Sequence, residues 1–63
     1  MASAFKKDFV TSRIARLKGQ NQRDYATAQW AWLNGLGPIP DPKQFEIGHR
    51  EAQAALIMLA SLK

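Results

Sequence analysis

The sequence contains no cysteine, only one histidine and no long apolar run. Without cysteine the chain can form no disulfide, and its one histidine and five carboxylates show none of the repeated spacings typical of metal ligands. We therefore expect no metal and no cofactor. The longest apolar stretch, residues 54–60, has seven residues, whereas a membrane-spanning helix needs about 20. These absences predict a soluble protein of the cytoplasm, or of the host cytoplasm if the chain is virus-encoded.

Residues that support catalysis are equally scarce. The lone histidine, His49, is predicted to lie beside the apolar face of a helix, where a structural role is the more common one. No serine or threonine stands in a nucleophile-elbow context, and no glycine-rich loop is present to cradle phosphate. A chain of 63 residues also has little room for a cleft that excludes water. We therefore predict a protein that is not an enzyme and that acts by binding.

What the sequence does contain is three helical segments separated by glycine and proline. Apolar periodicity and capping residues predict helices over residues 4–18, 22–34 and 42–62. Two glycines and two prolines in residues 35–40 predict an extended connector. We expect a single all-α domain over residues 1–63, in which a helical hairpin is followed by a third helix. In an open variant of this arrangement, oligomerisation completes the small core.

Capping residues define the predicted ends of these helices. Gly19 is expected to end the first helix in the left-handed conformation, and Asn21 to cap the start of the second. Gly35 is expected to stop the second helix in the same left-handed way. Asp41 followed by Pro42 is a strong start signal for the third helix.

Apolar residues at helical spacing predict the core. They are Val10, Ile14 and Leu17; Tyr25, Ala28, Trp32 and Leu33; and Phe45, Gly48, Ala52, Ala55, Leu59 and Leu62. Trp32 is expected in the core and Trp30 at its margin, or Trp30 is an exposed aromatic anchor of an interface. Ile57 and Met58 lie off the third apolar face, so the C-terminal half of that helix is apolar nearly all round. This indicates self-association or a docked partner, although single exposed apolar residues are common.

Positive charge is concentrated in the first third of the chain. Through Asp24 there are six basic and two acidic side chains, and from Tyr25 onward there are three of each. Such a basic surface attracts phosphate or an acidic protein surface, although a merely solvated helix face has the same composition. Our leading prediction is a small protein-interaction module that binds or regulates a larger protein with an acidic or mixed surface. The predicted partner-binding residues are Lys6, Lys7, Arg13, Arg16, Lys18, Arg23, Trp30, Ile57 and Met58.

The alternative prediction is nucleic-acid binding. The first two helices and the short turn between them have the spacing of a helix-turn-helix, with the second helix in the major groove. The expected base-reading residues are Gln22, Arg23, Thr27 and Asn34, with Arg16 and Lys18 on phosphate. The signal is weak, because only Arg23 on that helix is basic and short turns occur in any small bundle. A short, basic, cysteine-free helical chain is also typical, as a class, of phage-encoded proteins that bind host enzymes.

Overall fold

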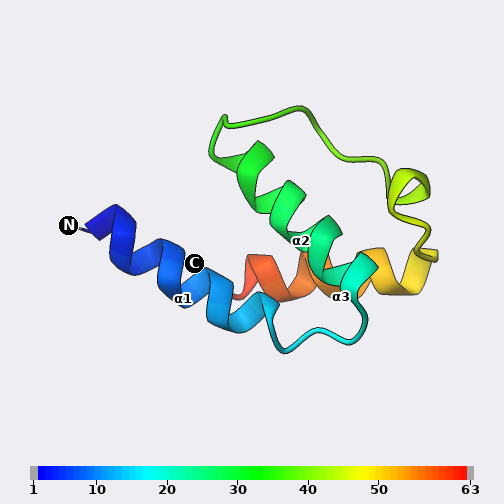
Figure 1. Cartoon of the computed structure of the whole chain (residues 1–63), viewed down its shortest axis with the longest axis horizontal. Helices are drawn as coiled ribbons and strands as arrows, with labels where there is room; N and C mark the ends of the chain where they lie inside the picture. Colours follow the sequence, from blue (N-terminus) through cyan, green and yellow to red (C-terminus); the bar gives the residue numbers. More distant parts are fainter. Residues whose placement is uncertain (1, 63) are drawn as a thin grey trace.

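The computed structural model describes the backbone of residues 2–62 and the side chains of residues 8–62. It contains three α-helices, α1 (Ala2–Ile14), α2 (Gln20–Leu33) and α3 (His49–Ala60), and one short 3₁₀ helix, η1 (Pro42–Phe45). Figure 1 shows α2 lying across α3, with α1 extending away from both. The predicted all-α, three-helix fold is therefore confirmed.

The first helix ends four residues earlier than predicted, at Ile14 rather than Lys18. The chain then tightens into a turn in which the amide of Leu17 donates to the carbonyl of Ile14 at 3.0 Å. The guanidinium of Arg23 in α2 donates to the carbonyl of Leu17 at 2.8 Å. A charged donor therefore binds the Leu17 carbonyl and holds this turn to the start of α2.

The start of α2 also differs from the prediction. The N-cap is Gly19 and not Asn21, and no side chain caps this end. Gly19 has φ 84°, a left-handed backbone conformation that glycine adopts without strain. The positive φ predicted at Gly19 is thus confirmed, but it serves to begin α2. The turn between the first two helices consequently spans residues 15–19 rather than residues 19–21.

The end of α2 follows the prediction closely. Gly35 has φ 72°, and its amide donates to the carbonyl of Trp32 at 3.0 Å. The amide of Leu36 reaches back to the carbonyl of Ala31 at 2.9 Å. This pair of bonds is a Schellman motif, which satisfies carbonyls that a helix end leaves without partners.

The predicted third helix is broken after its first turn. Asp41 does cap the start, because its carboxylate accepts from the amide of Lys43 at 3.0 Å. That turn is the 3₁₀ helix η1, and Glu46 then takes a left-handed conformation with φ 54°. A new helix, α3, begins at His49, where the Glu51 carboxylate accepts from the amide of Gly48 at 3.2 Å.

A tertiary contact accounts for this break. The ring of Phe45 packs edge-on against Tyr25 of α2, with 5.7 Å between centroids and 72° between planes. Aromatic pairs favour this geometry. Phe45 therefore lies on the short η1 and not on a continuous seven-residue repeat. Of the rest of the predicted third face, Gly48 is exposed, and four residues are buried or partly buried: Ala52, Ala55, Leu59 and Leu62.

Seven residues form the buried apolar core, and three of them are alanines. They are Val10, Ile14, Tyr25, Ala26, Ala52, Ala55 and Leu59. Ala26 and Ala55 are fully buried, so the backbones of α2 and α3 approach closely, and these two helices make the most extensive contact in the fold. The predicted pair Val10 and Ile14 is confirmed, and Leu17 packs against the same cluster.

The buried face of α2 is not the predicted one. Of the expected core residues only Tyr25 is buried, and two glutamines lie inside instead. Gln22 donates from Nε2 to the carbonyl of Glu51 at 3.0 Å, and Gln29 donates to the Tyr25 hydroxyl at 2.8 Å. Since both amides have partners, their burial carries little penalty, and the apolar Leu33 is left outside, 59% exposed.

Candidate interaction surface

The predicted basic residues gather around the turn between α1 and α2. Arg13, Arg16 and Lys18 are exposed, and we call these three the basic turn. The guanidinium of Arg13 lies over the ring of Phe9, 5.1 Å from its centroid, which is a cation–π contact. Lys6 and Lys7, also predicted to bind the partner, lie outside the residues whose side chains the structure describes.

Arg23 differs from the other basic residues in being committed to the fold. Its Nη1 donates to the carbonyl of Leu17 at 2.8 Å, and its Nη2 donates to Oε1 of Gln20 at 3.2 Å. Gln20 in turn donates to Asp24 at 2.8 Å. Arg23 therefore holds the turn to the start of α2, and a partner would have to compete with these bonds.

The side chains of α2 that were predicted to contact bases are already hydrogen-bonded within the fold. Gln22 is buried against α3, so it cannot reach a base edge in this conformation. The hydroxyl of Thr27 donates to the carbonyl of Arg23 at 2.9 Å, and the amide of Asn34 donates to the carbonyl of Trp30 at 2.8 Å. All four expected readers, Arg23 included, thus bond to backbone carbonyls.

Trp30 lies at the margin of the core, as one of the two predictions had it, but Trp32 does not lie in the core. Trp30 is partly buried and packs against the core, whereas Trp32, predicted in the core, is 40% exposed. The cause is a rotation of α2 relative to the sequence prediction, which places the Gln22, Tyr25 and Gln29 face inside. The exposed position predicted for Trp30 as an anchor is therefore wrong, and Trp32 is the tryptophan that is open to a partner.

An exposed apolar group lies where α2 ends and the connector begins. Trp32, Leu33, Leu36 and Ile39 are between 40% and 72% exposed, and we call these four the α2-end patch. Large apolar residues gathered in this way are typical of interaction sites. The sequence prediction had placed Trp32 and Leu33 inside, so this patch was missed.

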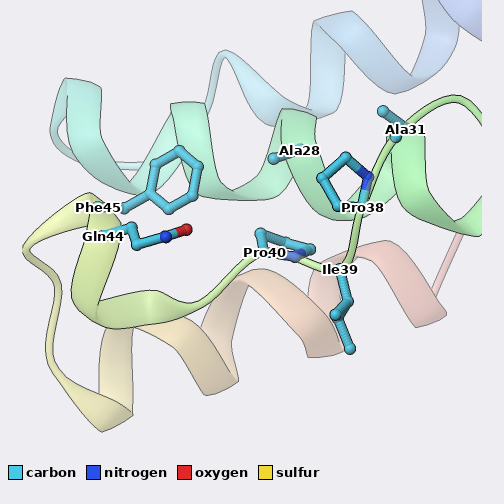
Figure 2. Close-up of a pocket in the computed structure, with 8 residues that line it drawn as sticks. Ala28, Ala31, Pro38, Ile39, Pro40, Gln44 and Phe45 are labelled. Atoms are coloured by element: carbon cyan, nitrogen blue, oxygen red, sulfur yellow. The ribbon is translucent and has the colours of Figure 1, made fainter.

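A shallow depression of about 200 Å³ lies beside the α2-end patch, between α2 and the connector. Figure 2 shows Pro38 next to Ala31, the ring of Phe45 directed toward α2, and Ile39 directed away from α2. Alanine and proline make up half of the eight lining residues. Such a depression has room for an apolar side chain and offers no charged group for catalysis.

A second exposed apolar surface runs along α3. Gln53, Leu56, Ile57 and Ala60 are all exposed and follow the i, i+3, i+4, i+7 spacing of one helix face. We call these four the α3 stripe. Ile57 is 65% exposed, as its predicted position off the core face requires, whereas Met58 is partly buried against the core. Of the two predicted apolar anchors, only Ile57 is therefore open to solvent.

The described part of the chain contains neither a cluster of metal-ligating side chains nor a helix able to cross a membrane. No group of three or more histidine, cysteine, aspartate or glutamate side chains among these residues is arranged to hold a metal ion. His49 is exposed at the first turn of α3. Within the same residues, no helix has the length and apolar character that crossing a membrane requires.

Comparisons with known proteins gave no relatives from which to argue. No family model matches the chain, and no curated protein and no solved structure is similar to it. The functional argument therefore depends on the surfaces of this molecule alone.

Proposed function

We propose that this chain is a small non-enzymatic interaction module that binds a larger protein of the cytoplasm and regulates it. One observation carries the proposal, the unusual distribution of apolar residues. Among residues 8–62, seven large apolar side chains are at least 39% exposed, while the apolar core has only seven buried residues and three of these are alanines. A partner that covers exposed apolar surface of this extent gains the free energy that the fold itself does not.

The basic turn supplies the electrostatic part of the proposal. Arg13, Arg16 and Lys18 are exposed, and the net charge of +4 arises entirely within the first 24 residues. A positive surface of this kind increases the rate at which an acidic protein surface is encountered. The basic turn precedes α2 and the α2-end patch follows it, so the partner is accordingly a protein whose acidic and apolar regions are separated by about 20 Å, the length of α2. The α2-end patch is its proposed apolar contact.

Affinity capture from an extract of the source cells tests the proposal. The bait is the wild-type chain, and the matched bait carries Leu33→Ser and Leu36→Ser, two substitutions at side chains that are 59% and 72% exposed. Ala54→Ser, also exposed, is the control. We expect a partner that the wild type and the control retain and the double variant loses. Equal capture by all three baits would contradict the proposal.

Non-specific binding to nucleic-acid phosphate is the second candidate. Only the exposed basic turn favours it, since α2 presents few free polar groups. Titration of labelled duplex and single-stranded DNA, followed by fluorescence anisotropy, tests this. We expect binding at low salt that disappears at near-physiological salt. Binding that persists there, and that is lost on replacing Arg16 and Lys18 with glutamine, would favour nucleic acid over protein.

A further inference from the structure

We infer that the α3 stripe is the contact between two copies of this chain, which pair through antiparallel α3 helices. The inference rests on the proposed function, because it assumes that exposed apolar surface is there to be covered. It assigns the second apolar surface to self-association and leaves the α2-end patch and the basic turn to the larger partner.

The area that the chain exposes fits a missing neighbour. A compact monomer of 7.1 kDa is expected to expose about 4,100 Å², and this chain exposes 4819 Å². The excess, roughly 700 Å², is close to the surface of about 800 Å² that each partner contributes to a standard interface. The excess is a property of the whole chain, α1 included, and its size is that of one standard contact.

Charge identifies the second copy as the occupant of the α3 stripe. No residue from Ala52 to Leu62 is charged, so the stripe offers an acidic partner nothing to pair with. The charged groups on α3 are Arg50 and Glu51, in its first turn. Because these two cancel, two α3 helices can face each other without bringing net charge together. An uncharged, partly apolar partner fits this surface, and another α3 is one.

The order of residues in the stripe is self-complementary. The stripe is symmetric about the midpoint between Leu56 and Ile57, as a two-fold contact between identical surfaces requires. In an antiparallel pair, Leu56 of each copy faces Ile57 of the other, and the long Gln53 faces the small Ala60. This places bulky side chains at the centre and matches a large residue with a small one at each end.

The expected dimer is weak. The stripe extends over only about two helical turns and includes two large apolar side chains, so its area is at the low end for protein contacts. We expect a dissociation constant of about 10 µM to 1 mM, the regime of small transient interfaces. Since the contact is apolar, salt should leave it unchanged or strengthen it, in contrast to the binding of an acidic partner.

Cross-linking through introduced cysteine tests the arrangement, because the natural chain has none. Ile57→Cys places a thiol next to the two-fold axis, and Thr27→Cys, at an exposed site on α2, is the matched control. Only cysteines whose Cα atoms come within about 7 Å can form the bond. At concentrations near the dissociation constant, we expect Ile57→Cys to cross-link about tenfold faster than Thr27→Cys under mild oxidation.

Two further measurements test whether the two α3 helices run antiparallel and whether the α3 stripe is the surface in contact. A mixture of Gln53→Cys and Ala60→Cys chains should cross-link to each other more readily than either does to itself, whereas a parallel pair would give the reverse. In sedimentation equilibrium, Ile57→Ser should weaken the dimer by about tenfold or more. Rates for Ile57→Cys no faster than for Thr27→Cys would overturn the inference. If capture of a partner still depended on Leu33 and Leu36, the proposed function would remain supported. If capture did not depend on them either, both the dimer and the proposed function would be contradicted.

Discussion

The close approach of α2 and α3 predicts that enlarging one alanine will be costly. Ala26 is 0% exposed and belongs to the same buried cluster as Ala52 and Ala55. Replacing Ala26 with leucine adds three carbon atoms where no space is left, and such overpacking costs about 1–3 kcal/mol. A domain of 63 residues is stable by only about 3–9 kcal/mol in total. The substitution therefore removes a substantial share of the stability.

Urea denaturation followed by circular dichroism measures this effect. With a denaturant slope of about 1 kcal/mol/M, Ala26→Leu should lower the urea midpoint by about 1 M or more. Ala54→Leu is the control, since it makes the same chemical change at an exposed position within α3, and leucine and alanine have similar helix propensities. Its stability should change by no more than about 0.5 kcal/mol. If the two variants had the same midpoint, the claim that α2 and α3 pack through alanines would be refuted.

Three other substitutions probe the local structure, each by thermal or urea unfolding. Gly35→Ala should destabilise by about 1 kcal/mol, because φ at this residue is 72° and a side chain is strained there. Gly37→Ala is the control, because this glycine has no positive φ and has open space around it. It should be neutral or slightly stabilising. Tyr25→Phe should cost about 1 kcal/mol, because Gln29 loses its buried acceptor, and a second change, Gln29→Leu, should recover part of that loss. Asp41→Ala should also cost about 1 kcal/mol through loss of the cap, and an unchanged midpoint would show that η1 is held by Phe45 instead.

The features that depend on local backbone chemistry could be predicted from the sequence. The number of helices, the stop at Gly35 and the cap at Asp41 all follow from residues within one or two turns of the position concerned. Val10 and Ile14 were predicted correctly as core residues because α1 has one clear apolar stripe in its second half. These predictions required no knowledge of which helix packs against which.

The features that depend on tertiary contacts could not be predicted in this way. On the buried face of α2, Gln22 donates to the carbonyl of Glu51 in α3, and Gln29 donates to Tyr25 within α2. Apolar periodicity contains no signal for a buried glutamine. The break before α3 follows from the packing of Phe45 on Tyr25. The rotation of α2 affected the candidate site, since the sequence prediction had placed Trp32 and Leu33 inside the core. The one available warning was the low apolar content of the supposed inner face, on which Ala28 is the residue between Tyr25 and Trp32.

The most direct test of the central claim is a titration of the purified chain with the purified captured protein at low and at near-physiological salt. The account predicts saturable binding that Leu33→Ser with Leu36→Ser weakens at both salt concentrations, because the contact at the α2-end patch is apolar. It also predicts weaker binding at the higher salt, because the basic turn meets an acidic surface. Binding that is indifferent to both Leu33 and Leu36 would contradict the account, whatever its dependence on salt.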